Sequence, residues 1–554
     1  MQRRFASAKR DLRSVYDAVR EKGPSEIQFW FLALLVGIGA GLTALCFRWA
    51  ISALQTLFYG TDDASILHSI TAELPWYWIC LLPVFGGFVV GWIFKLMTPD
   101  GRVRSVADVI EGAALHEGRV EKRAGLASGL ASLITLSTGG SAGREGPVVH
   151  LAAVISSWVS TRIDASGITG RDLLGCAVAG AVSASFNAPI AGALFAMEVI
   201  LRHFALHAFA PIVVASVAGT VVNRLAFGNV TEFILPTDNY FSFYQELPAF
   251  LLLGALCGGV AVAFMKAVFW SDDFGNLIER VFKIPTWARP MIAGALLGVI
   301  ALAFPHIIGV GYGTTSAALS GHLLWHEAVI FTVLKIAAVS ITMGGRMGGG
   351  IFSPSMMIGA LTGLSFGIIA TAIFPDNSGS ETLYALAGMG AVAAAVLGAP
   401  ISTTLIVFEM TGDWQTGLAV MVAVSISTAI SSRLIDHSFF LTLLERRNIH
   451  LAAGPQAYLL SVHRVAQIMR PLDDDKSVRE EALWALVEQG FYIDGNATLE
   501  TAMPVFDRSR ADYIPVVTLA GEDQPPELWG ALFHVDALKA MNKALSDTAA
   551  EEHS

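Results

Sequence analysis

Long stretches of this sequence carry no charged residue, and they restrict the possible folds more than any other feature. A helix of roughly 20 apolar residues crosses the hydrocarbon core of a bilayer. Only 15% of the 554 residues are charged, whereas soluble proteins have about 25%. We therefore predict an all-α polytopic membrane protein. Its uncharged runs include Gln28–Phe47, Leu74–Phe94, Leu173–Met197, Met347–Pro375 and Thr382–Phe408.

Proline and glycine interrupt several of these runs. Pro189 and Pro400 lie inside two of them, and three glycines lie near the start of the run that begins at Met347. Proline removes a backbone donor and tends to break a helix. Broken helices within a membrane are tolerated only where protein buries them or where they line a wet cavity. The interruptions therefore predict pairs of shorter helices, some of which end inside the membrane, and indicate a transport protein.

The charge distribution predicts the topology and the domains. Residues 1–22 contain seven Lys and Arg against three Asp and Glu, and such an excess marks the cytoplasmic side. Basic residues recur after the last run at Arg433, Arg446 and Arg447, which also favours a cytoplasmic C-terminus. No apolar segment with a cleavage site precedes the first span, so no cleaved signal peptide is expected. We predict a multi-pass protein of the cell inner membrane.

The end of the chain differs in composition from the rest. Residues 455–554 contain 17 Asp and Glu but eight Lys and Arg, a net charge of −9 out of −10 for the whole chain. This contrast predicts a separate, acidic, soluble domain. The predicted segments are a cytoplasmic N-terminus at 1–27, a transmembrane domain at 28–450, an α/β domain at 456–546 and a disordered tail at 547–554.

An internal repeat divides the transmembrane domain. Ala-Pro-Ile occurs at 188–190 and at 399–401, and a glutamate follows each proline by nine residues, at Glu198 and Glu409. All four matches are 211 residues apart, and a glycine cluster lies upstream of each. Secondary transporters are often built from such repeats. We predict two repeats at about 28–230 and 245–450. The repeated residues are compatible with either an inverted or a parallel arrangement.

Two glycine-rich segments have the composition of helix starts that bind an anion. GREGP at 143–147 and GGGIFSP at 348–354 each place flexible glycines and a proline before an apolar run. A helix N-terminus has unpaired N–H groups and about half a positive charge, so it can hold an anion without a cationic side chain. Proline costs nothing in the first turn, because its missing N–H would have been unpaired. Two such ends predict a site for a small anion such as chloride.

Glu145 lies within the first of these segments, beside Arg144. A carboxylate inside a membrane is a functional candidate. Ionised, it would compete with an anion for the same N–H groups; protonated or turned away, it would let the anion pass. The alternative is a structural ion pair between Arg144 and Glu145.

Four segments resemble motifs of the CLC family of chloride channels and proton-coupled chloride exchangers. They are GREGP at 143–147, GGIFSP at 349–354, FNAPIAGALFAMEV at 186–199 and GAPISTTLIVFEMTGD at 398–413. The resemblance covers roughly residues 28–450. It implies a homodimer with one ion path per subunit, an inverted repeat of tilted helices, and Glu145 as the external gate. It further implies an anion site formed by Gly143, Arg144, Gly146, Gly350, Ile351 and Phe352, with Phe352 also narrowing the path.

The chain departs from the family pattern at three places. The family's Gly-Ser-Gly-Ile-Pro motif is replaced by VRSVADVIEGA at 103–113, where Ser105 is either an anion ligand or an ordinary helix-start serine. Phe440 stands where many members have an inner tyrosine, so it either narrows the path or merely packs. Val199 replaces the second of two consecutive glutamates that relay protons in exchangers. Glu198 remains a possible proton-path residue, or a capping residue.

The acidic domain at 456–546 resembles a cystathionine-β-synthase-type (CBS) module. Residues 496–517 predict a helix followed by a strand, and residues 528–545 predict a strand followed by a helix. Such modules usually pair and bind adenine nucleotides, but here the first copy is too short. Phe533 also occupies the place of the serine or threonine expected three residues before Asp536. Nucleotide binding is therefore not expected.

The sequence as a whole predicts a voltage- or pH-gated chloride channel in the lipid bilayer. The alternatives are a chloride/proton exchanger, also gated by Glu145, and a non-transporting membrane sensor. No nucleophile–base set, metal-ligand spacing or phosphate-binding loop is found, so we expect no enzymatic activity, metal or cofactor, and no nucleic-acid partner.

Overall fold

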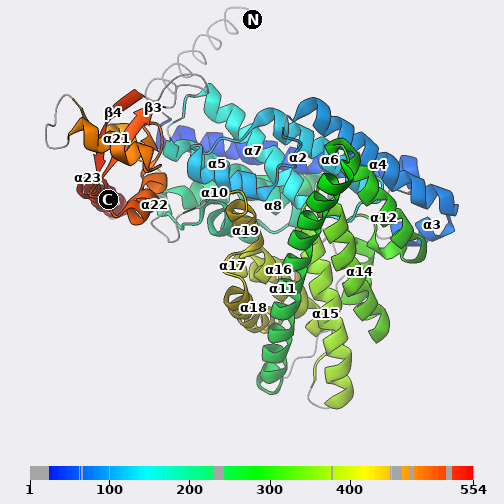
Figure 1. Ribbon diagram of the computed structural model, residues 1–554. Helices are drawn as coiled ribbons and strands as arrows, with labels where there is room; N and C mark the ends of the chain where they lie inside the picture. The colour runs from blue at the N-terminus through cyan, green and yellow to red at the C-terminus, as the bar shows by residue number, and fades with distance from the viewer. Residues whose placement is uncertain are drawn as a thin grey trace, which may run out of the picture.

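The computed structural model describes a large helical body and a small α/β domain at one side of it (Figure 1). The described residues are 24–61, 63, 66–98, 100–165, 167–228, 243–375, 378–449, 451, 464–472, 479–518 and 527–552.

The helices of the body follow one another in two halves. Those of the first half, blue to cyan in Figure 1, are α2 (Glu26–Tyr59), α3 (Leu67–Glu73), α4 (Trp76–Met97), α5 (Val106–Leu115), α6 (Lys122–Ser137), α7 (Glu145–Arg162), α8 (Gly167–Phe186), α9 (Pro189–Phe195), the π-helix η1 (Ala196–Leu201) and α10 (Leu206–Phe227). Those of the second half, green to yellow, are α11 (Phe243–Phe282), η2 (Thr286–Ala288), α12 (Arg289–Ala303), η3 (Pro305–Ile307), α13 (Tyr312–Leu319), α14 (Trp325–Gly344), α15 (Phe352–Ile373), α16 (Glu381–Leu397), α17 (Pro400–Thr411), α18 (Trp414–Leu434) and α19 (Phe439–Glu445).

The body is that of a multi-pass membrane protein. Within the described part of the chain, eight helical segments are long and apolar enough to cross a bilayer. Large apolar side chains such as Trp30, Phe31 and Leu225 lie exposed on its outside, as a lipid environment allows. The predicted all-α membrane class is confirmed.

Both helices predicted to break at proline do so. α8 ends at Phe186 and α9 begins at Pro189, with Asn187 between them in the left-handed region at φ +57°. α16 ends at Leu397 and α17 begins at Pro400, with Gly398 at φ +69°. The left-handed residue reverses the chain, and proline starts the next helix at a position whose N–H has no intrahelical acceptor.

The two repeats cap each other through their glutamates. The carboxylate of Glu409 accepts hydrogen bonds from the N–H groups of Ile190 (3.0 Å) and Ala191 (2.8 Å), at the start of α9. Glu198 accepts from the N–H groups of Ile401 (3.0 Å) and Ser402 (2.8 Å), at the start of α17. The partners keep the 211-residue offset. A reciprocal contact of this kind is what a two-fold axis produces, so the two elements are related by a local two-fold axis.

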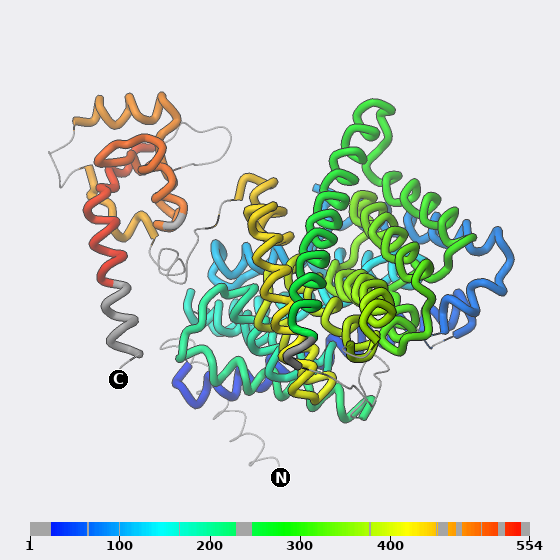
Figure 2. The backbone as a smooth tube through the Cα atoms, turned by 90° about the horizontal axis from the view of Figure 1, so that it is seen from below, coloured from blue at the N-terminus to red at the C-terminus, as the bar shows by residue number. Residues whose placement is uncertain are grey.

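The C-terminal domain carries a four-stranded sheet in the order β1-β4-β3-β2 (β1, Arg470–Pro471; β2, Ile493–Asp494; β3, Tyr513–Thr518; β4, Glu527–Phe533). β4 is antiparallel to both β1 and β3, and β2 is parallel to β3. Its helices are η4 (Val465–Gln467), α21 (Glu480–Glu488), α22 (Leu499–Ser509) and α23 (His534–Glu552). The predicted helix–strand and strand–helix orders are thus both present. Figure 2 shows this domain, in orange and red, beside the helical body.

The ends of the predicted segments differ in detail from the structure. α2 begins at Glu26, and residues 1–23 of the predicted cytoplasmic N-terminus lie outside the described residues. α23 extends to Glu552, into the segment 547–554 for which we expected disorder. Alanine and glutamate are strong helix formers, so Ala549, Ala550 and Glu551 can extend the preceding helix.

The reciprocal caps lead to a stability prediction. In Glu409→Gln, one of the two acceptor oxygens becomes an amide nitrogen and the charge opposite the helix start is lost. A hydrogen bond to a charged group contributes about 1.5–3 kcal/mol, so the unfolding temperature of the detergent-solubilised protein should fall measurably. The exposed Glu445→Gln serves as control. Equal unfolding temperatures for the two variants would contradict the capping role.

Candidate anion-binding site

The two glycine-rich segments are joined by a pair of backbone hydrogen bonds between Gly143 and Gly350, which are 207 positions apart. The N–H of Gly143 donates to the carbonyl of Gly350 (2.6 Å), and the N–H of Gly350 donates to that of Gly143 (2.7 Å). The approach is so close that a Cβ on Gly146 would lie 3.1 Å from the Cα of Gly350. Gly349 has φ +118°, a conformation that side chains other than hydrogen rarely allow. The glycines are therefore required for the two chains to meet.

Two helices begin at this junction. Arg144 is the N-cap of α7 and Ile351 is the N-cap of α15. Pro147 and Pro354 occupy the third position of their helices, so they contribute no N–H there. The remaining first-turn amides, including those of Gly146 and Phe352, have no acceptor within their own helix. Two positive helix ends are thus held side by side.

A narrow, largely apolar cavity lies at the junction, with an empty volume of about 390 Å³. Seven of its lining residues were named from the sequence: Ser105, Glu145, Gly146, Gly350, Ile351, Phe352 and Phe440. The other six were not: Val106, Val149, Phe195, Met343, Gly349 and Phe439. The predicted helix starts, the helix-start serine and the inner phenylalanine therefore surround one space.

Glu145 lies in this cavity, with only 1% of its surface exposed. Its Oε1 accepts hydrogen bonds from the hydroxyl of Ser353 (2.6 Å) and from that of Tyr312 (3.1 Å). Its Oε2 is buried and has no hydrogen-bond partner within the described part of the chain. Two hydroxyl groups thus hold the Glu145 carboxylate through one of its oxygens.

Arg144 and Glu145 do not form the close ion pair that was the structural alternative to a gating role for Glu145. Its Nε is 4.0 Å from Oε1 of Glu145, at the limit of an ion pair and farther away than either hydroxyl. Its guanidinium lies over the ring of Tyr312, 5.0 Å from the ring centre. Arg144 therefore packs against the tyrosine that orients the carboxylate.

Sequence reasoning missed Tyr312, Ser353 and Lys335. Tyr312 starts α13 after Gly311, which has φ +89°. The fully buried Lys335 donates from Nζ to the carbonyls of Ile307 (3.3 Å) and Gly309 (3.1 Å) in the preceding loop. The lysine thus fixes the loop that presents the tyrosine hydroxyl. The signal available in the sequence was Lys335, which is the single charged residue of the segment 328–344.

Ser105 both caps a helix and lines the cavity. Its Oγ accepts from the N–H of Ala107 (3.3 Å), and its own N–H donates to Asp108 Oδ2 (2.7 Å). Such a capping box starts a helix without proline. The altered segment 103–113 therefore still begins a helix, α5, at the cavity.

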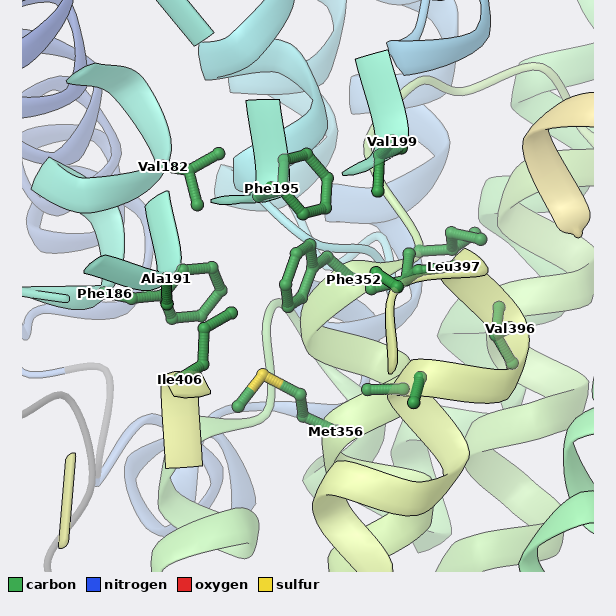
Figure 3. Packing of buried hydrophobic residues seen from close by; sticks show 14 of the residues in the cluster. Val182, Phe186, Ala191, Phe195, Val199, Phe352, Met356, Val396, Leu397 and Ile406 are labelled. Atoms are coloured by element: carbon green, nitrogen blue, oxygen red, sulfur yellow. The ribbon is translucent and has the colours of Figure 1, made fainter. Parts of the chain in front are cut away.

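Aromatic rings close the space around Phe352. Its ring centre lies 4.7 Å from that of Phe186 and 5.6 Å from that of Phe195. Figure 3 shows these three rings facing one another, with Met356 and Ile406 nearby. At another part of the lining, Phe440 packs edge-on against Phe439. An occupant of the cavity would meet apolar walls and backbone amides.

A wider vestibule adjoins the cavity and shares Ser105, Met343, Gly349 and Phe439 with it. Its charged lining consists of four arginines and two aspartates: Arg102, Arg346, Arg446, Arg447, Asp272 and Asp273. Clefts lined mainly by one sign of charge concentrate ions of the opposite sign. The vestibule therefore favours anions.

Three of the residues named from the sequence have other roles in the geometry. The amides of Gly143 and Gly350 are used by each other, so these glycines frame the site and do not offer free N–H groups. Glu198 lies outside the cavity lining, and its carboxylate caps α17. The capping alternative accounts for its contacts.

Residues 86–432 match the family model described as voltage gated chloride channel. The chain belongs to this family, the CLC family.

Relatives support the same assignment. A putative chloride channel protein ClcB-like of Ralstonia nicotianae is 29% identical over 396 residues, covering 71% of this chain and 91% of the relative. The voltage-gated ClC-type chloride channel ClcB of Escherichia coli is 30% identical over 422 residues, covering 74% and 97%. The crystal structure of a slow cyanobacterial Cl⁻/H⁺ antiporter has the same fold, with a TM-score of 0.67 at 22% identity over 76% of this chain and 97% of the other. This CLC chain is an anion-transport protein.

The contacts of Glu145 lead to a prediction about Ser353. In Ser353→Ala, the carboxylate loses its shorter hydrogen bond, and a bond to a charged group contributes about 1.5–3 kcal/mol. The carboxylate should leave the cavity more readily, so chloride efflux from reconstituted vesicles at neutral pH should rise about tenfold.

Ser355→Ala is the matched control for Ser353→Ala. Ser355 is also buried in α15, but its hydroxyl donates to the carbonyl of Ile351 within the helix. Efflux should be unchanged in this variant. Equal efflux from both variants would contradict the holding role of Ser353.

Proposed function

We propose that this protein conducts chloride, or a similarly small anion, through a channel that Glu145 closes. The observation that carries the proposal is the convergence of two helix N-termini on one cavity that also contains the Glu145 carboxylate. Gly146, Ile351 and Phe352 would supply amides to the anion, and Ser105 a hydroxyl. Phe352 and Phe440 would narrow the path on either side.

Charge repulsion explains why one carboxylate suffices as a gate. Two unit charges 4 Å apart repel by about 4 kcal/mol at an effective dielectric constant of about 20, which corresponds to roughly a thousandfold in occupancy. An ionised Glu145 in the cavity and an anion at the same amides therefore exclude each other. Protonation removes the repulsion and the competition together, so acid should open the path.

The contacts around α9 favour a channel over a proton-coupled exchanger. Val199, which cannot carry a proton, stands where exchangers have their second glutamate. Glu198 is committed to capping α17. Among the described residues that line the cavity, Glu145 is the only acid. A proton that reaches Glu145 therefore has no acidic partner in that lining to take it farther.

We further propose how the channel lies in the cell. The resemblance of the motifs at 143–147 and 349–354 to those of the CLC family implies a homodimer with one path per subunit, and we propose this assembly here. The arginine-lined vestibule contains Arg446 and Arg447, which follow the last apolar segment. By the positive-inside rule it would be the cytoplasmic mouth, with both termini on that side of the cell inner membrane.

The experiment that separates channel from exchanger is the reversal potential of vesicles containing the purified protein. A channel reverses at the chloride equilibrium potential whatever the pH gradient. An exchanger reverses at a potential that shifts with the pH gradient. Such a shift would replace the channel proposal with chloride/proton exchange, and the absence of any ion flux would favour a membrane sensor.

Glu145→Gln tests the gate directly. The amide has the shape of the protonated acid and no charge, so chloride efflux should be high and nearly independent of pH. The wild-type protein should show efflux that increases as the pH falls. Efflux is measured in vesicles over a range of pH values, with Glu198→Gln assayed in parallel. A steep pH dependence that persists in Glu145→Gln would contradict the assignment of the gate.

A further inference from the structure

A second basic site lies between the C-terminal domain and the helical body. An open cleft there, with an empty volume of about 1440 Å³, is lined from the body by the end of α5, the following loop and the start of α8. Arg464, Gln467, Asn496 and Thr498 line it from the C-terminal domain. It shares no residue with the cavity at Glu145. The cleft is a separate feature with walls from two domains.

The lining of this cleft is strongly polar and mainly basic. It contains Arg119, Arg171 and Arg464 against a single carboxylate, that of Glu117. α8 begins at Gly167 in this lining, and α22 begins after Thr498, whose side chain makes no capping bond. Both helices therefore direct their positive ends to the same space as the arginines. Guanidinium groups in such a setting recognise phosphate by paired hydrogen bonds.

Two of the arginines in the cleft bind the carboxylate of Glu117. Its carboxylate accepts hydrogen bonds from Nη1 of Arg119 (2.6 Å) and from Nη2 of Arg464. Burial opposes its ionisation, but the hydrogen bonds from Arg464 and Arg119 outweigh burial and keep the pKa of Glu117 below its usual range. The Glu117 carboxylate thus uses hydrogen-bond donors of two arginines that could together bind a larger anion.

We propose that this cleft binds a phosphate-bearing ligand, either a soluble nucleotide or polyphosphate or the headgroup of an anionic phospholipid. Arg119 and Arg464 bind the phosphate with the guanidinium groups that now bind Glu117. The first-turn amides of α8 donate to the same phosphate. The ligand then bridges the helical body and the C-terminal domain. Ligand binding at this site can be measured without any ion flux, so its test is separate from the test of the gate.

The position of Arg171 gives the ligand a route to the anion path. Its guanidinium donates from Nε to the carbonyl of Ala113 (2.5 Å) and from Nη2 to that of Ala114 (2.8 Å), in the last turn of α5. The other end of α5 begins beside Ser105, at the cavity. A phosphate that draws Arg171 away from these carbonyls loosens the helix that positions Ser105.

The test compares ligand binding by four variants of the full-length protein in detergent. ATP and inorganic pyrophosphate are titrated against each variant, and the shift in unfolding temperature gives the affinity. Arg119→Gln and Arg464→Gln should each weaken binding at least about tenfold. Arg508→Gln is the control, because Arg508 is an exposed arginine of the same C-terminal domain outside the cleft.

Glu117→Gln separates a binding site from a simple contact between domains. It removes the competing carboxylate, so the affinity for pyrophosphate should rise in this variant. If Arg464 and Glu117 served only to join the domains, Glu117→Gln would behave like Arg464→Gln, with a lower unfolding temperature and no gain in binding.

The lipid source is tested in nanodiscs of phosphatidylcholine with or without phosphatidylglycerol. The cleft is assigned to a lipid headgroup if phosphatidylglycerol stabilises the wild-type protein but not Arg119→Gln, and if ATP and pyrophosphate have no effect. A response to ATP or pyrophosphate assigns it to a soluble ligand. The proposal is overturned if neither stabilises the wild-type protein, or if the cleft variants respond like Arg508→Gln.

Discussion

The paired hydrogen bonds between Gly143 and Gly350 are the contact on which the anion site depends. They bring together the N-termini of α7 and α15, which belong to different repeats. Both helix ends carry a partial positive charge, so they repel each other. That repulsion must be offset by the surrounding packing, and an anion or a carboxylate between the two ends relieves it. In the proposed function, the carboxylate of Glu145 is this negative charge. The need to neutralise two converging helix ends would then account for both the proposed binding site and the proposed gate.

The hydroxyl groups around Glu145 set how firmly this substitute anion is held. Ser353 comes from the start of α15 and Tyr312 from the start of α13, so the carboxylate of α7 is tied to two further helices. Lys335 adds a buried amine whose hydrogen bonds order the loop before Tyr312. The Glu145 side chain is thus held by elements of the second repeat, although Glu145 belongs to the first. If Glu145 is the proposed gate, opening would break these hydrogen bonds together, which favours two distinct states of the side chain.

The sequence was informative where one residue type has a single physical use. Uncharged runs predicted the spans, Pro189 and Pro400 predicted the breaks, and the glycine clusters predicted two helix starts whose residues now line one cavity. It was less informative where a role depends on what lies across the fold. Ser353 and Tyr312 look like ordinary helix residues until the chain brings them to Glu145. Glu198 and Glu409 were visible as a repeat, but only their mutual capping of α17 and α9 explains why both repeats keep a carboxylate there. Gly143 and Gly350 were named as anion-binding residues, and the sequence could not show that their amides pair with each other, because the two glycines are some 200 positions apart.

Helix α5 connects the two basic regions of the molecule. Its ten residues span about 15 Å, from Ser105 at the anion cavity to Leu115 at the cleft beside the C-terminal domain. At its first turn, Asp108 accepts from the N–H of Ser105 and pairs with Arg447 at 2.9 Å. At its last turn, Arg171 binds two carbonyls. A short helix held by arginines at both ends transmits a displacement at one end to the other, because little of its length is free to absorb it. On the proposal that the cleft binds a phosphate-bearing ligand, α5 would be the physical path by which that ligand affects the position of Ser105.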